Sequence, residues 1–293
     1  MEFTLENRYL KVTVTTWGAQ VKSVIRKSDG VEHMWQADKS VWGYHAPILF
    51  PYAGKLKDGI MEVDGTTYHP PGQHGFARTS EHRFVRQSED TVVLELTDSA
   101  ETLKVFPWKF RLLSTFRLEN DTLHHTLTVE NRDEKAFSFG IGYHPAFALP
   151  FDDKHTYQDY ELRFSQMETP LCLATQPTGL IQTQHYSLGN NITAIPIDEK
   201  LFADDSHCMI GLQSETLGLY ETGTGRGVVC HISGFPYVLL WSMPGKPHFV
   251  CIEPWMSLPS FEGSSIKWED KPAAAILSPG ESWSTTLSMS FVR

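Results

Sequence analysis

The chain of 293 residues carries 25 Lys and Arg against 35 Asp and Glu, which gives a formal net charge of −10. This negative balance, together with the lack of any basic block, disfavours a nucleic-acid or anionic-membrane partner. Hydrophobic residues make up 41% of the chain, enough for a sizeable core, yet no apolar run approaches the length of a transmembrane helix.

The N-terminal residues 1–8 contain neither a basic region nor an apolar stretch, so we expect no secretory signal and a cytoplasmic protein. The cysteines are scattered without CxxC spacing, which predicts reduced, mostly buried thiols. They are Cys172, Cys208, Cys230 and Cys251. The histidines show no HxxxH or HExxH spacing, and no phosphate-binding loop precedes a predicted helix, so we expect no metal and no cofactor.

Alternation of apolar and polar residues with a period of two dominates the chain and predicts β-strands. The clearest segments, in chain order, are 110–118, 122–129 and 283–291. Turn signals such as Asp64-Gly65 lie between the strand-like runs. Many short strands with regular turns predict an all-β fold, a large antiparallel β-sandwich. No repeat or linker interrupts the pattern, so we expect residues 1–293 to form one domain.

Three segments depart from the strand pattern. Residues 99–105 predict a short helix that Asp98 caps and Pro107 ends, with an acidic residue at the reciprocal capping position. The other two have the least regular pattern, and we predict long loops there, at residues 150–155 and 187–201.

Ionisable residues interrupt the apolar pattern at three places. Glycines flank Gln73-His74, so the backbone can turn tightly and present the imidazole to a cleft, although a surface histidine is the simpler alternative. His144 precedes a proline that holds it extended, and its alternative is a packed histidine bonded to a carbonyl. Glu253 follows an apolar run that should be buried, where a carboxylate is costly unless it is paired or functional. Burial would raise the pKa of Glu253 toward a range useful for proton transfer.

Together, the motifs QHGFAR at 73–78, GYHPAF at 142–147 and CIEPW at 251–255 resemble the aldose 1-epimerase (galactose mutarotase) family, most closely its LacX-like branch. The resemblance implies a galactose mutarotase-like β-supersandwich. It also implies a cofactor-independent isomerase that interconverts the α and β anomers of a sugar. Under this resemblance Glu253 is the base at the sugar O1 and His144 the acid at the ring oxygen O5. His74 would then hydrogen-bond the ring oxygen or a nearby hydroxyl, although the two histidines could exchange roles.

The resemblance further implies residues that contact the sugar. A basic residue of the family falls at Lys55, where better-known members have an arginine, and lysine lacks the bidentate fork of arginine. An aspartate that contacts sugar hydroxyls in the family falls at Asp205, with Asp204 as the alternative position. Other residues expected at the sugar are Gln73, Arg78 and Trp241, the last as a stacking surface near Glu253.

Three functions stay open at this stage: epimerisation of a free hexose, epimerisation of a hexose 6-phosphate, and sugar binding without catalysis. Related 6-phosphate enzymes have an arginine at the position that Gly43 occupies here, which favours a free hexose, although Arg78 could serve a phosphate. The presence of all three ionisable residues favours an enzyme, since a binding module needs only groups that read hydroxyls. The quaternary structure stays open between a monomer and a homodimer.

Overall fold

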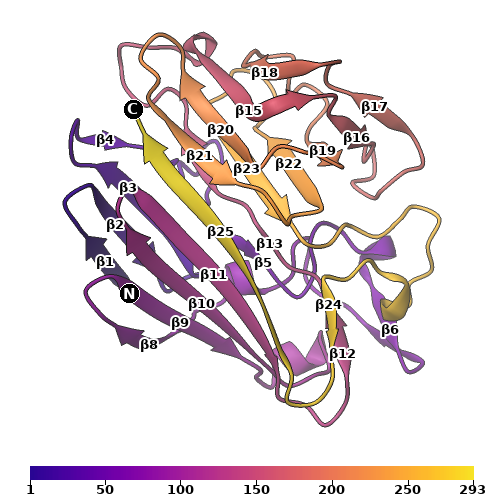
Figure 1. Cartoon of the computed structure of the whole chain (residues 1–293). Helices are drawn as coiled ribbons and strands as arrows, with labels where there is room; N and C mark the ends of the chain where they lie inside the picture. The colour runs from indigo at the N-terminus through magenta and orange to yellow at the C-terminus, as the bar shows by residue number, and fades with distance from the viewer.

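A computed structural model describes all 293 residues. It contains 25 strands, five short 3-10 helices and no α-helix, so the predicted all-β, antiparallel architecture is confirmed (Figure 1). The strands form a nine-stranded sheet, an eight-stranded sheet, a four-stranded sheet and two strand pairs. None of the helical segments is long and apolar enough to cross a membrane.

The nine-stranded sheet follows directly from the alternation in the sequence. In its central strands every second side chain is buried, while the opposite face carries a ladder of hydroxyl pairs such as Thr126–Thr286, 2.8 Å apart. All neighbouring strands are antiparallel. In spatial order the strands are β18 (Ile192–Pro196), β15 (Tyr160–Glu168), β20 (Thr216–Glu221), β21 (Gly227–His231), β25 (Ser282–Val292), β11 (Thr122–Asn131), β10 (Phe110–Glu119), β9 (Thr91–Thr97) and β8 (Arg83–Gln87).

The eight-stranded sheet carries the continuous apolar run that ends in the CIEPW motif. All seven residues of its strand β23 are buried, because the strand has paired neighbours on both sides and packed faces above and below. In spatial order the strands are β17 (His185–Ser187), β16 (Leu171–Leu173), β19 (His207–Ile210), β22 (Tyr237–Trp241), β23 (Phe249–Trp255), β13 (Gly142–Tyr143) and β5 (Ile48–Leu49), while β14 (Ala146–Ala148) also pairs with β23.

The remaining elements are short. The four-stranded sheet consists of β1 (Glu2–Glu6), β2 (Leu10–Thr15), β3 (Gln20–Arg26) and β4 (Val31–Glu32). The two strand pairs are β6 (Met61–Val63) with β7 (Thr66–Tyr68), and β12 (Phe137–Phe139) with β24 (Ala275–Leu277). The 3-10 helices are η1 (Lys57–Gly59), η2 (Ala77–Thr79), η3 (Thr102–Lys104), η4 (Tyr157–Asp159) and η5 (Trp268–Asp270).

Two of the local predictions were wrong. The helix expected at 99–105 is only the 3-10 turn η3, which no side chain caps: Glu101 rather than Asp98 precedes it, and Ser99 exchanges hydrogen bonds with Thr102. Pro107 follows so closely that there is room for a single turn. The loop expected at 187–201 contains β18, an edge strand that pairs only with β15 and can therefore end in a proline. Residues 150–155 contain no strand, as expected.

The core connects the sheets to one another. One cluster of 57 buried apolar residues extends from Leu5 to Phe291. Within it, Tyr143 of β13 reaches across to the nine-stranded sheet, where its hydroxyl oxygen lies 2.7 Å from the His125 carbonyl on β11 and 2.8 Å from the Thr285 carbonyl on β25. The strand that leads into His144 is therefore attached to the opposite sheet.

We predict that Tyr143→Phe lowers the free energy of unfolding by about 1 kcal/mol, because it removes a buried hydrogen bond and keeps the ring. Urea unfolding measures this change. Tyr157→Phe is the matched control, since the hydroxyl of Tyr157 bonds Glu199 at the exposed surface and its loss should matter less. Equal effects of the two substitutions would contradict the anchoring role of Tyr143.

Candidate active site

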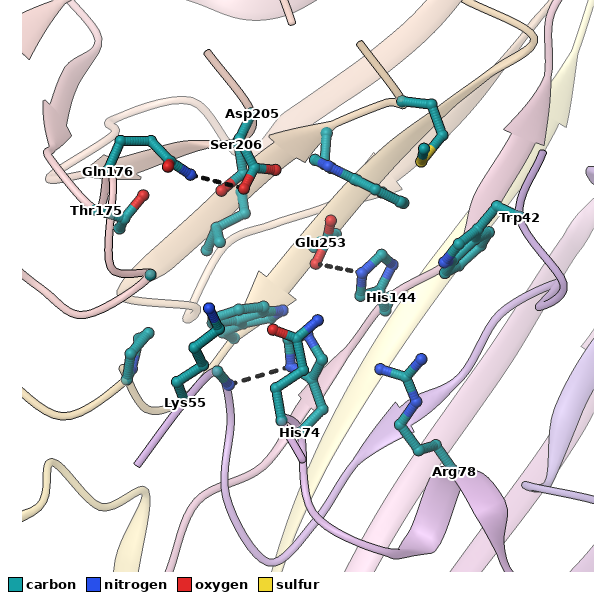
Figure 2. Close-up of a pocket in the computed structure, with 18 of the residues that line it drawn as sticks. Trp42, Lys55, His74, Arg78, His144, Thr175, Gln176, Asp205, Ser206 and Glu253 are labelled. Carbon is teal, nitrogen blue, oxygen red and sulfur yellow. Dashed lines mark hydrogen bonds and ion pairs between the residues drawn. The ribbon is translucent and has the colours of Figure 1, made fainter. Parts of the chain in front are cut away.

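Side chains from separate loops and strand ends line one pocket of about 400 Å³, a size typical of small-ligand sites (Figure 2). The residues expected from the sequence all lie in this one lining, although they are far apart along the chain. They are Lys55, Gln73, His74, Arg78, His144, Asp205, Trp241 and Glu253. Asp204, the rival of Asp205, does not line the pocket.

Strand register brings Glu253 and His144 together. Gly142 pairs with Trp255 and Ala146 pairs with Cys251, so the positions midway between them, His144 and Glu253, lie opposite each other. Alternation along β23 turns Glu253 toward the pocket and its neighbour Ile252 toward the main core. Nε2 of His144 lies 3.3 Å from Oε2 of Glu253.

Burial determines the ionisation of this pair. The exposed fractions of the two side chains are only 7% for His144 and 2% for Glu253. Burial raises the pKa of Glu253 well above its ordinary value, and the nearby charge of Asp205 adds to this effect. Burial likewise lowers the pKa of His144 to about 3. Over the pH range between these two pKa values the proton resides on Glu253, and His144 is neutral.

His74 is held in one orientation and one tautomer by its backbone and by Gly54. Its φ of 69° is unusual for a residue with a side chain. The backbone N–H of His74 donates to the Gly54 carbonyl at 2.8 Å, and the backbone N–H of Gly54 donates to the ring Nδ1 of His74 at 3.1 Å. An N–H group can only donate, so Nδ1 is unprotonated and the neutral ring carries its proton on Nε2. Burial lowers the pKa of His74 well below its ordinary value, which keeps the ring neutral.

The turn before η2 tolerates no larger residue than glycine at position 75. Gly75 has a φ of 69°, and a Cβ atom there would lie 2.1 Å from the carbonyl oxygen of Phe50. This close approach of two backbone segments holds the residue after His74 against the strand end that leads to Lys55.

Aromatic rings surround the pair. The Trp42 ring stacks on His144 with a centroid distance of 5.1 Å, and Trp241 approaches the same imidazole edge-on at 5.6 Å. Trp255 approaches His74 edge-on at 5.5 Å. Trp42 was not predicted at the site, because it lies in an irregular segment without a motif to mark it.

Two cations contribute to the pocket in different ways. Arg78 is nine-tenths buried, its guanidinium carbon lies 4.1 Å from the centre of the Tyr44 ring, and it takes part in none of the ion pairs of the molecule. Lys55 is exposed at the pocket mouth, where its Nζ donates to the Thr178 carbonyl at 3.1 Å. Arg78 is therefore a buried cation that has an aromatic ring but no carboxylate as its neighbour.

Asp205 is positioned by a loop that the sequence analysis did not single out. Its φ is 77°, and its Oδ2 accepts a hydrogen bond from Nε2 of Gln176 at 2.7 Å. Polar residues of this region that also line the pocket are Thr175, Gln176 and Ser206. They carried no motif, and only the folding of two distant loops brings them to the site.

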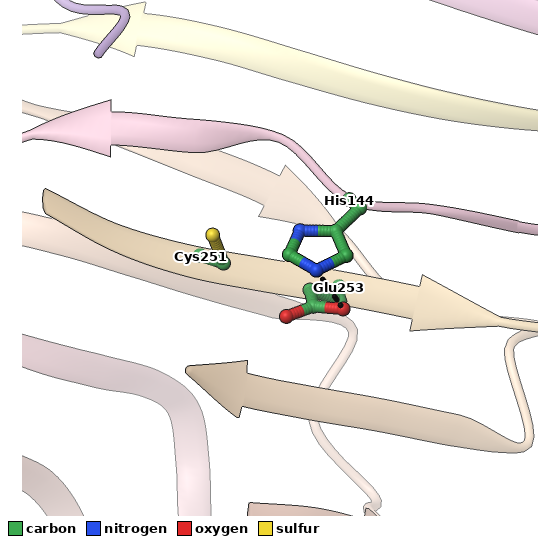
Figure 3. A group of neighbouring side chains, drawn as sticks. All are labelled: His144, Cys251 and Glu253. Carbon is green, nitrogen blue, oxygen red and sulfur yellow. Dashed lines mark ion pairs between the residues drawn. The ribbon is translucent and has the colours of Figure 1, made fainter. Parts of the chain in front are cut away.

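His144, Cys251 and Glu253 offer three ligand atoms that all lie within 4.8 Å of one another (Figure 3). Burial raises the pKa of the Cys251 thiol well above its ordinary value of 9.0. Since a thiolate, not a thiol, is the metal ligand, this donor set is poorly suited to a metal. In a second group, Asp152, His155 and Glu221, the Arg226 guanidinium already binds both carboxylates.

Comparisons with known proteins agree with this geometry. The family model described as aldose 1-epimerase matches residues 1–290. Chromosomal protein LacX of Lactococcus lactis subsp. lactis is 32% identical over 292 residues, which cover 95% of this chain and 95% of that protein. A galactose mutarotase related enzyme from Lactobacillus acidophilus has 30% identity and a TM-score of 0.94, covering 100% of this chain and 98% of that one. A galactose mutarotase-like protein from Lactobacillus casei ATCC 334 has 28% identity and a TM-score of 0.90, covering 100% of both chains. These likenesses confirm the predicted galactose mutarotase-like fold.

Glu253→Gln should become more stable than the unaltered protein as the pH rises. The folded pKa of Glu253 is raised, so its carboxyl stabilises the fold below the unfolded pKa and loses that contribution as the pH rises through the folded pKa. The difference in unfolding free energy should grow by about 1.4 kcal/mol per pH unit between those two pKa values. Calorimetry between about pH 5 and 9 measures it. Glu262→Gln, at an exposed position, is the control, and a pH-independent difference for Glu253→Gln would contradict the raised pKa.

Proposed function

The chain belongs to the aldose 1-epimerase family, a class of isomerases, and from this premise we propose that it interconverts the α and β anomers of a free hexose. The observation that carries the proposal is the buried Glu253–His144 pair, 3.3 Å apart in a pocket of about 400 Å³. The two oxygens that must exchange protons, O1 and O5, are bonded to the same sugar carbon, C1. A base and an acid that serve both oxygens must therefore lie close together, as these two groups do.

The reacting form of the pair has Glu253 as carboxylate and His144 as imidazolium, and it forms from the neutral pair when the carboxyl proton moves to Nε2 of His144 across the 3.3 Å contact. Glu253 takes the O1 proton while His144 gives its proton to O5, and the C1–O5 bond breaks to leave an aldehyde at C1. Glu253 is then protonated and His144 neutral. After rotation about C1–C2, O5 attacks C1 again and returns its proton to His144, while Glu253 returns its proton to O1. The proton count of the pair is the same at the start and at the end.

Burial favours the form of the pair that accompanies the open-chain sugar. Both pKa shifts disfavour charge, so the neutral acid and neutral imidazole are stabilised relative to the ion pair. The two forms differ only in the position of one proton, and neither requires a metal or a cofactor.

His74 serves as a neutral hydrogen-bond donor in this scheme. Its Nδ1 already accepts from Gly54, so Nε2–H is the group left for the ring oxygen or a neighbouring hydroxyl. This supports assigning the acid role to His144 rather than to His74. Asp205 and Lys55 lie at the polar side of the pocket, where they can bind hydroxyls, and Trp241 offers an apolar surface for a sugar face.

A hexose 6-phosphate is the second candidate substrate. The observation that favours it is Arg78, a nine-tenths buried guanidinium without a carboxylate partner. Against it stand Gly43 at the position of the expected phosphate-binding arginine and the net charge of −10. We therefore expect free hexoses to react with the higher kcat/KM.

Exchange spectroscopy on the anomeric protons of free and 6-phosphorylated aldoses tests the function and the substrate class together. The expected result is accelerated exchange with a preference for a free hexose. A clear preference for a 6-phosphate would transfer the proposal to the second candidate and to Arg78. No acceleration with any aldose, by a protein that still binds sugar, would favour a binding module.

Glu253→Gln keeps the shape of the side chain and removes the base. We expect anomer exchange to fall by about 10²-fold or more, the scale of a lost general base, while the protein stays folded and still binds sugar. The exposed Glu262→Gln should exchange at the unaltered rate. A folded Glu253→Gln protein with unaltered exchange would exclude Glu253 from the mechanism.

A further inference from the structure

Lys271 is the only lysine among the buried residues of the chain, with an exposed fraction of 8%. It follows η5 directly and does not line the pocket. No carboxylate pairs with it. Its Nζ instead donates to two backbone carbonyls, that of Leu258 at 2.5 Å and that of Ala53 at 3.4 Å. A buried amine without a counter-ion is costly, which raises the question of what it contributes.

The two carbonyls belong to two loops that form the floor of the pocket. The Ser260 N–H donates to the Lys55 carbonyl at 2.9 Å, which joins the loops on one side of Lys271. Gly54 packs so closely on Pro259 that a Cβ at Gly54 would lie 2.2 Å from the proline ring. Lys271 is the side chain that hydrogen-bonds to both of these loops, and it is not itself part of the pocket lining.

The peptide that Lys271 holds is the one that orients His74. The Ala53 carbonyl and the Gly54 N–H belong to the same planar peptide group, so fixing one fixes the direction of the other. The Gly54 N–H donates to the ring Nδ1 of His74, and the backbone N–H of His74 donates back to the Gly54 carbonyl. The chain of contacts therefore runs from Lys271 through one peptide group to the imidazole.

We propose that Lys271 is a positioning residue for His74, which holds the Ala53–Gly54 peptide so that His74 keeps its Nε2–H directed at the sugar. The inference rests on the proposed function for its effect on turnover, but not for its effect on the imidazole. The charge of Lys271 also helps to keep the His74 ring neutral. The ammonium form of Lys271 opposes a second positive charge on His74, and burial lowers the pKa of Lys271 to about 7. The neutral amine still has two N–H groups, one for each carbonyl.

Lys271→Met tests this proposal, because it keeps the length of the apolar side chain and removes the donors and the charge. The first readout is the pair of imidazole nitrogen shifts of His74 in an NMR spectrum. In the unaltered protein we expect unprotonated Nδ1 and protonated Nε2. In Lys271→Met we expect a mixture of tautomers. The second readout is kcat for anomer exchange, which should fall by about 10-fold to 10²-fold, the scale of a displaced catalytic group, with a smaller change in KM.

Lys267→Met is the matched control, since it removes the same charge from an exposed position four residues earlier. It should leave both readouts unchanged. Lys271→Gln keeps a polar head in the site but is one bond too short to span both carbonyls. We expect it to behave as Lys271→Met does, and it replaces that variant if Lys271→Met does not fold.

A folded Lys271 variant that keeps a single Nε2–H tautomer and the unaltered kcat would overturn the proposal, even if its melting temperature is lower. So would an unaltered protein in which Nδ1 of His74 carries the proton. The tautomer readout needs no turnover. If no aldose is epimerised, the proposed function fails while the nitrogen shifts still decide the role of Lys271.

Discussion

The exposed fraction of the Glu253 side chain is 2%, and this burial is the constraint to which the rest of the site responds. A buried carboxyl group is tolerable only if it can share a proton or accept hydrogen bonds. The register of β23 with β13 and β14 supplies the partner, because it sets His144 directly across from Glu253. The aromatic rings around the pair keep its dielectric low, which favours the neutral carboxyl and the neutral imidazole over the ion pair.

The two large sheets contribute differently to the position of the Glu253–His144 pair. The eight-stranded sheet carries Glu253 and, between β13 and β14, His144, and the nine-stranded sheet packs against it through the core. Tyr143 links them, since its hydroxyl bonds carbonyls of β11 and β25 while the next residue is His144. On the other side of the pocket, His74 depends on backbone contacts with Gly54 rather than on a strand. A displaced loop would therefore affect His74 before it affects the Glu253–His144 pair.

Local prediction failed where a short segment depended on its neighbours. A loop was expected at 187–201 because the pattern there is irregular, and the pairing of β18 with β15 at the sheet edge is what makes part of it a strand. The short helix expected at 99–105 shrank to one turn because Pro107 follows it so closely. In both places the pattern of a few residues was less informative than the neighbouring strand β15 or the nearby Pro107.

The strand architecture can be read from the sequence alone, since alternation with a period of two has only one economical solution, a sheet with one buried face. The sequence also marked Glu253, because a carboxylate follows an apolar run there, whereas His144 and His74 were singled out by the family resemblance. Packing in three dimensions was needed to show that Asp205 and not Asp204 lines the pocket, that Trp42 stacks on His144, and that Lys271 bonds the Ala53 carbonyl. These contacts join segments up to 218 residues apart, and such contacts are set by the packing of loops, whose sequences have no period to read.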